Sequence, residues 1–224
     1  MKCEISSFEK LKYITTFPDD FDASRRYPCI IFLHGAGTRG DDITLLSGNC
    51  YFEYYSKHCL EAISVAPQCN ADSWCDVHEQ LCRFAEYVST LPYVDRTKVS
   101  LIGASMGGYE AWQLSISRPE LFAAAVPICG GGAYWNAARL ASIPIIAFHG
   151  KEDTCVFSEE SVKMVNAVNA SGGNARLELL DGVGHAAWER AYSSKELFEW
   201  MLSQKKSETR TSTERMLSNP VIYG

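Results

Sequence analysis

Short apolar runs alternate with longer amphipathic stretches from about residue 28 to residue 203. Several of these runs are almost continuously apolar, which is typical of parallel strands that are covered on both faces. The predicted strands are residues 29–33, 62–66, 99–102, 123–129, 143–148 and 176–180.

Three of the intervening segments have apolar residues at helical spacing. The first has a face formed by Val77, Leu81, Phe84, Val88 and Leu91. Asp76 and Glu79 resemble a capping pair at its start. The second runs from about residue 158 to a stop at 172–173, and the third covers about 188–202. Because strands and helices alternate, we expect an α/β fold: an open, mostly parallel sheet with helices on both faces.

Size and composition favour one globular domain. The chain has 224 residues, 46% of them hydrophobic, and its formal net charge is −6 without a basic stripe. Nucleic acid is therefore not an expected partner. We expect a domain over 1–203 and a polar segment over 204–224, for which a flexible tail and an arm on this or a neighbouring subunit, as in a homodimer, are both open.

The cysteines and the N-terminal residues bear on the compartment. The chain has nine cysteines, an odd number, and none forms a close pair of the kind that binds zinc. The first twelve residues show no secretory pattern, and no apolar run approaches the roughly 20 residues of a membrane helix. We therefore expect a cytoplasmic protein that uses its thiols mainly as small buried hydrophobes, with neither a membrane nor a metal as partner.

Residues 103–108, Gly-Ala-Ser-Met-Gly-Gly, join a predicted strand to a helix-like segment. This is the pattern of a nucleophile elbow, in which a tight turn exposes a serine hydroxyl above the sheet. Ser105 is therefore the candidate nucleophile. The backbone N–H of Met106, at the start of the helix, is a candidate oxyanion donor.

A serine nucleophile needs a general base. His185 is the best candidate, because it lies in a glycine-rich loop between the last predicted strand and a helix. His149 ends a strand before the expected acid, so we expect it to pack or bond locally. His58 and His78 precede the serine, which is the wrong order for this arrangement.

The base in turn needs an orienting acid. Asp153 follows the strand 143–148, so its carboxylate is expected at the same sheet edge. Glu152 and Asp181 are the alternatives. The resulting order of serine, acid and histidine is that of α/β-hydrolases.

A second oxyanion donor is expected after the strand 29–33, where residues 33–37 read Leu-His-Gly-Ala-Gly. Small residues there let backbone N–H groups approach a substrate oxygen. Ala36 is the first candidate and Gly37 the second.

With these motifs in place, the chain resembles compact α/β-hydrolases of the carboxylesterase, dienelactone-hydrolase and prolyl-oligopeptidase-related group. The matching stretches are 27–28 through 34–37 with 39–42, 66–69 with Trp74, 105–109, 125–131, 149–153, and 184–185 with Trp188. The resemblance implies a serine, an acid, a base and an oxyanion hole at these positions. Dienelactone hydrolases proper have a cysteine at the elbow, so Ser105 favours ordinary ester hydrolysis. The chain has no room for the propeller of prolyl oligopeptidases.

The expected activity is hydrolysis of small or aryl esters through an acyl-enzyme, without a cofactor. Only about fourteen residues follow the strand 123–129 before the next one, so a large cap domain is not expected. Trp74, Tyr134, Trp135 and Trp188 are candidate substrate-binding residues for an acyl or aryl group, including feruloyl and acetyl esters of plant polysaccharide fragments. A small serine peptidase and a non-catalytic binding protein are the alternative functions.

Overall fold

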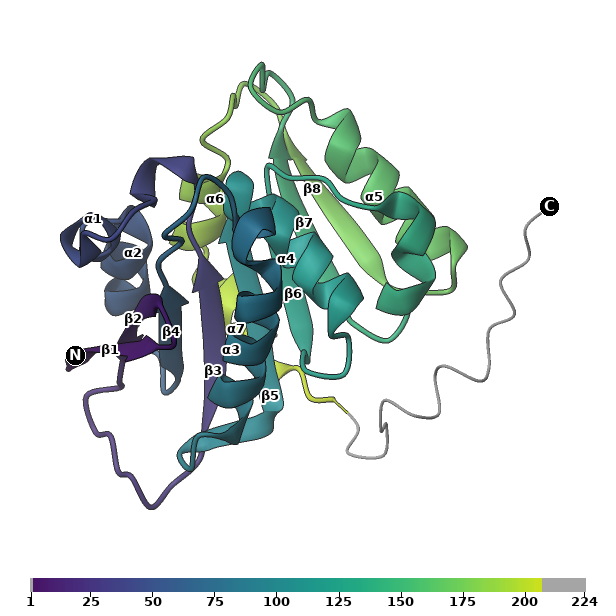
Figure 1. The fold of residues 1–224 in the computed structure, drawn as a ribbon. Helices are drawn as coiled ribbons and strands as arrows, with labels where there is room; N and C mark the ends of the chain where they lie inside the picture. The colour runs from purple at the N-terminus through teal and green to yellow at the C-terminus, as the bar shows by residue number, and fades with distance from the viewer. Residues whose placement is uncertain (1, 207–224) are drawn as a thin grey trace.

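A computed structural model describes residues 2–206 of the chain (Figure 1). Its eight strands form one sheet in the order β1-β2-β4-β3-β5-β6-β7-β8. The strands are β1 (Cys3–Phe8), β2 (Leu11–Thr16), β3 (Tyr27–Leu33), β4 (Ile63–Pro67), β5 (Val94–Ala104), β6 (Ala124–Ile128), β7 (Ile145–Gly150) and β8 (Ala175–Leu180). From β4 to β8 all neighbouring strands are parallel, which confirms the predicted sheet.

The antiparallel hairpin β1–β2 was not predicted. It pairs with β4 through β2, also antiparallel, and so extends one edge of the sheet. β1 is an edge strand whose residues are almost all exposed, so its sequence carries no apolar run. Such an element leaves little trace in a hydrophobic pattern, because nothing covers either of its faces.

Helices cover both faces of the sheet. The first face carries α3 (His78–Thr90), α4 (Met106–Ser117) and α5 (Glu159–Ala170), which lie in front of the strands in Figure 1. The second face carries α1 (Ile43–Ser47), α2 (Cys50–His58), α6 (Trp188–Ser193) and α7 (Lys195–Ser203). β3 shows the alternation directly: Ile31 packs into the first core and Phe32 into the second.

Three short 3-10 helices complete the fold: η1 (Ala36–Thr38), η2 (Trp74–Val77) and η3 (Tyr134–Leu140). η2 corrects the predicted cap of α3. The capping box is formed one turn earlier by Ser73 and Asp76, in which the side chain of each residue accepts the backbone N–H of the other. Glu79 takes no part in it. In the described chain η3 is the one element between β6 and β7, so no separate cap domain covers the sheet there.

The cysteines are less buried than we expected. All nine lie among the described residues as free thiols, but only Cys29, Cys69, Cys82 and Cys129 are buried. Four others are exposed, so the expectation that the thiols act mainly as small buried hydrophobes is wrong.

Within residues 2–206, no helix combines the length and the apolar character needed to cross a bilayer. Most of the expected tail, 207–224, lies outside the described residues.

A buried ion pair joins α3 to α4, the helix that follows Ser105. Nδ1 of His78 lies 2.6 Å from Oε1 of Glu110, whose side chain is 1% exposed. Hydrogen bonds with Cys82 and with Glu110 raise the pKa of His78 to about 10. Burial raises the pKa of Glu110, and this effect is larger than the lowering caused by its hydrogen bond to His78.

We expect Glu110→Gln to lower the free energy of unfolding by about 2 kcal/mol at pH 6, because it leaves the cation of His78 without its partner. A raised histidine pKa stabilises the folded state fully below the unfolded value of 6.5, and this contribution is lost as the pH rises through about 10. Urea unfolding at pH 6 and pH 10 measures the difference. Glu79→Gln, at an exposed position of α3, is the control. If Glu110→Gln lowered the free energy of unfolding by the same amount at both pH values, the role of the ion pair would be contradicted.

Candidate active site

Ser105 lies at the junction of β5 and α4, as the elbow pattern predicts. Its backbone has φ 57° and ψ −118°, a strained conformation for a residue other than glycine. Its N–H donates to the carbonyl oxygen of Ile128 on β6, at 2.8 Å. At Gly107 a Cβ atom would lie 2.1 Å from the carbonyl oxygen of Leu33, so only glycine lets α4 start this close to β3. The turn therefore holds the Ser105 hydroxyl at the carboxyl ends of the central strands.

His185 contacts the serine from a loop between β8 and α6. Nε2 of His185 lies 2.8 Å from Oγ of Ser105, and Nδ1 lies 2.7 Å from Oδ2 of Asp153. The loops that carry His185 and Asp153 touch at Gly150, where a Cβ atom would lie 2.2 Å from the carbonyl oxygen of Gly184. The structure thus brings together the three residues that the sequence singled out as nucleophile, base and acid.

Asp153 is 4% exposed, and both of its carboxylate oxygens accept hydrogen bonds. Its Oδ1 accepts the backbone N–H groups of Cys155, at 2.9 Å, and Val156, at 3.0 Å. Burial alone would raise the pKa of this carboxyl group, but the bonds to His185 and to the two amides lower it below its usual value. Asp153 is therefore held as an anion beside the imidazole.

The two alternative acids lie elsewhere. Glu152 is exposed, and Asp181 is exposed and forms an ion pair with Lys151 on the surface. Neither makes a described contact with His185. The side chains of neighbouring residues point in different directions here, so Asp153 turns inward while Glu152 faces solvent.

The loop after β3 contains the expected oxyanion donors. Ala36 and Gly37 line the same cavity as Ser105 and His185. Met106 is the first residue of α4, and the first N–H groups of a helix have no acceptor within it. Its side chain packs away from the cavity, against the core of the first sheet face. The backbone N–H groups of Ala36 and Met106 therefore remain the candidates for binding an oxyanion.

Buried polar groups that we did not single out hold this loop in place. Nε2 of His34 accepts the backbone N–H of Cys69 at 2.9 Å, so Nδ1 carries the proton and donates to the carbonyl oxygen of Gly35 at 2.7 Å. Burial lowers the pKa of His34 to about 4, which keeps the ring neutral. Gln68 donates to the carbonyl oxygens of Thr38 and Asp42. The sequence feature that could have identified His34 and Gln68 is their position directly after β3 and β4, at the carboxyl edge of the sheet.

A cavity of about 440 Å³ lies next to Ser105 and His185. Of the four predicted aromatic residues, only Trp188 lines it, and its ring lies edge-on to the His185 ring, with centroids 5.3 Å apart. Trp74 is 1% exposed and donates to the carbonyl oxygen of His34, so its expected contact with substrate is wrong. Tyr134 and Trp135 are exposed on η3 and do not line the cavity, so the structure does not bring them together with Ser105 and His185.

The other residues that line the cavity come from elements far apart in the sequence. They include the apolar side chains Phe32 and Tyr192 and the start of α2, with Asn49 and Cys50. These residues form no recognisable sequence pattern, because β3, α2 and α6 come together only in the folded chain. Sequence spacing alone therefore could not find them.

Two more residues adjoin the triad-like group. His149 bonds locally, as expected: its Nε2 lies 2.9 Å from the carbonyl oxygen of Val156 and 3.3 Å from Oδ2 of Asp153. Cys129, directly after β6, has φ 50° and its thiol donates to the carbonyl oxygen of His185 at 3.1 Å. Both therefore support the loops that carry the acid and the histidine.

Known proteins share both the sequence pattern and the fold. The model of the dienelactone hydrolase family matches residues 57–218. A probable feruloyl esterase C from Aspergillus terreus is 25% identical over 169 residues, which are 72% of this chain and 62% of that protein. The crystal structure of a thermostable esterase is 28% identical, with a TM-score of 0.81 over 92% of this chain and 63% of the other.

Est1E from Butyrivibrio proteoclasticus, solved with ferulic acid bound, shares the fold at 13% identity. Its TM-score is 0.66, and the match covers 90% of this chain and 98% of the other. The chain thus spans somewhat over three fifths of the feruloyl esterase and of the thermostable esterase. Since the family model matches more than half of its residues, the protein belongs to the dienelactone hydrolase family.

Proposed function

We propose that the protein is a serine carboxylic-ester hydrolase. The observation that carries the proposal is the bonded chain from Asp153 through His185 to Ser105, on a strained elbow beside a cavity. Relatives named as esterases support the same activity.

The hydrogen bonds define which proton moves. Nδ1–H of His185 donates to the Asp153 carboxylate, which leaves the lone pair of Nε2 to accept the proton of Ser105 Oγ. As Oγ attacks the ester carbonyl carbon, the proton passes to Nε2 and the carbonyl oxygen becomes an oxyanion. The N–H groups of Ala36 and Met106 are the proposed donors to it.

Collapse of this intermediate completes the first half of the reaction. The alcohol leaves with the proton from Nε2, and the acyl group stays on Ser105. Water then attacks the acyl-enzyme, with His185 again taking a proton, and the acid is released. Asp153 stabilises the charged imidazole in both halves, and its lowered pKa keeps it anionic near neutral pH.

The cavity favours an aryl ester as substrate. Three aromatic residues adjoin it, the partly exposed Trp188 and the buried Phe32 and Tyr192, and its volume of about 440 Å³ is in the range of small-molecule sites. A feruloyl ester fits this chemistry, and of the similar proteins one is named a probable feruloyl esterase and another was solved with ferulic acid bound. We therefore propose hydroxycinnamoyl esters, with small acyl esters as weaker substrates.

A panel of p-nitrophenyl acetate, methyl ferulate and chromogenic peptides tests activity and preference together. We expect turnover of the esters and none of the peptides. Trp188→Ala should lower kcat/KM for methyl ferulate by about 10-fold and for the acetate by less, because it removes one apolar wall.

Trp135→Ala is the matched control, since this tryptophan is 73% exposed and lies outside the cavity. It should leave both rates unchanged. Faster cleavage of peptides than of esters would favour the peptidase alternative. Failure to hydrolyse any member of the panel would favour a non-catalytic binding protein.

A further inference from the structure

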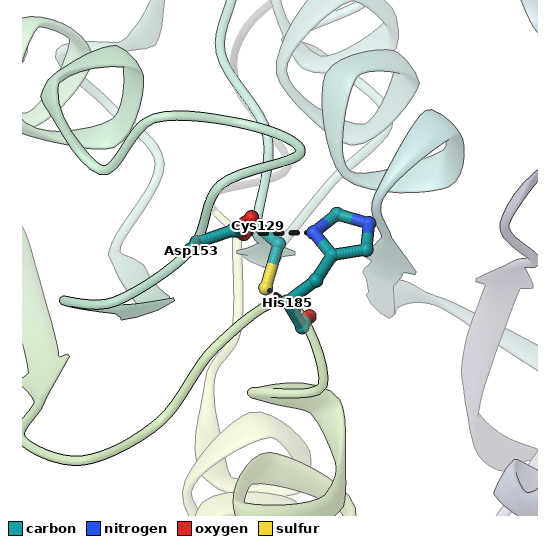
Figure 2. Close-up of side chains that lie close together, drawn as sticks. All are labelled: Cys129, Asp153 and His185. Atoms are coloured by element: carbon teal, nitrogen blue, oxygen red, sulfur yellow. Dashed lines mark hydrogen bonds and ion pairs between the residues drawn. The ribbon is translucent and has the colours of Figure 1, made fainter.

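Three metal-ligating side chains converge at the candidate active site. Cys129 follows β6, Asp153 follows β7 and His185 follows β8, so neighbouring parallel strands deliver one each. Their ligand atoms all lie within 4.8 Å of one another. Figure 2 shows Nδ1 of the His185 ring bonded to Asp153, and the sulfur of Cys129 bonded to the backbone carbonyl oxygen of His185.

The donor set is that of a zinc site. Zn²⁺ prefers thiolate sulfur, imidazole nitrogen and carboxylate oxygen, at roughly 2.3, 2.0 and 2.1 Å. Ligand atoms in a tetrahedron of these bond lengths are roughly 3.5 Å apart. Side-chain shifts of about 1 Å would therefore bring the three atoms from their present separations, all within 4.8 Å, into ligand geometry.

Hard cations fit this cluster poorly. Mg²⁺ and Ca²⁺ need six or more oxygen ligands or retained waters, and a buried thiol offers neither. The side chain of Asp153 is 0% exposed and Cys129 is fully buried, while His185 retains 24% exposure. An ion would therefore reach the cluster from the cavity, past His185.

We propose that Cys129, Asp153 and His185 form an inhibitory binding site for Zn²⁺ or a similar thiophilic divalent cation. The inhibitory part rests on the proposed ester hydrolase function. Binding forms bonds from the cation to sulfur, nitrogen and oxygen. It breaks the S–H bond of Cys129, whose proton goes to solvent. It also breaks the Nδ1–H bond of His185, whose proton goes to solvent while Nε2 takes up a proton from solvent, so that one proton is released in total. No electron is transferred.

This change of tautomer explains the expected inhibition. In the free protein Nε2 has the lone pair that faces Oγ of Ser105, at 2.8 Å. With the cation on Nδ1, a neutral ring carries its proton on Nε2 and donates it to Oγ. The serine then has no base, and the Asp153 carboxylate is engaged by the metal. The ion would stop the reaction without occupying the substrate cavity.

The test titrates Zn²⁺ against the initial rate of ester hydrolysis, with each variant compared with its own metal-free rate. We expect inhibition of the wild type that EDTA reverses and that Mg²⁺ does not reproduce. Cys129→Ser should raise the inhibition constant at least about 10-fold, because a hydroxyl is a poor zinc ligand. Cys155→Ser, at an exposed thiol, is the matched control and should keep the wild-type inhibition constant.

Direct binding separates this proposal from the proposed function. Calorimetry on Ser105→Ala should show one Zn²⁺ per chain, because the serine is not a ligand, and Cd²⁺ should give a thiolate charge-transfer absorption. Asp153→Asn should weaken binding with the thiol intact. Binding without any esterase activity would keep the metal site and refute the hydrolase. Ester hydrolysis with Zn²⁺ inhibition unchanged in Cys129→Ser, or with no bound ion, would overturn the metal site.

Discussion

Replacing Ser105 by alanine is expected to lower kcat/KM for p-nitrophenyl acetate by a factor on the order of 10⁴ or more. The hydroxyl lies 2.8 Å from Nε2 of His185, and the elbow holds it at the cavity. Without it, the acyl-enzyme cannot form, and only binding and the oxyanion donors still act on the ester. A phosphonate probe should label the wild type and not this variant.

The chain contains a close control for this experiment. Oγ of Ser117 lies 2.9 Å from Nε2 of His78, whose Nδ1 bonds Glu110 at 2.6 Å. This serine, histidine and carboxylate are joined as in a triad, but they lie between α3 and α4 and none of them lines the cavity. Ser117→Ala should therefore keep both activity and probe labelling. Loss of labelling in Ser117→Ala, with retention in Ser105→Ala, would move the nucleophile to α4.

The comparison of these two groups shows how sequence reasoning selected the histidine that the structure places beside Ser105 and the cavity. Strands β3 to β7 are largely buried, β8 is partly buried, and all six run parallel, so their apolar runs mark which loops lie at the carboxyl edge of the sheet. His185 follows the last of these strands, whereas His78 begins a helix before the serine. Chain order and position after a strand therefore separate them, although both bond a serine and a carboxylate.

Other features could not be predicted, for physical reasons. Whether an aromatic ring faces a cavity depends on packing between distant elements: Trp74 is held inward by its bond to His34, while Trp135 projects into solvent. The approach of Cys129 to His185 depends on a backbone φ of 50°, which the sequence does not encode locally. The polar edge strand β1 lacks an apolar pattern altogether.

The assignment of the acid leads to the second large effect. Asp153→Asn is expected to lower kcat/KM for p-nitrophenyl acetate by about 10⁴-fold, as loss of the carboxylate does in other serine triads. Glu152→Gln and Asp181→Asn should stay near the wild-type rate, because both carboxylates face solvent. Steady-state kinetics on the three variants measures the ranking, and a circular dichroism melt confirms that each is folded.

The two backbone amides that bond Asp153 imply that Asp153→Asn does more than remove a charge. The N–H groups of Cys155 and Val156 both point at the Oδ1 position of Asp153, so an asparagine there must place its carbonyl oxygen toward them. Its NH₂ group then faces Nδ1 of His185 and donates to it, which forces the imidazole proton onto Nε2. The base is lost by the same change of tautomer that a cation on Nδ1 would cause. If Glu152→Gln were the slower enzyme, the carboxylate that faces solvent here would have to turn inward during catalysis, and the role of Asp153 would be structural.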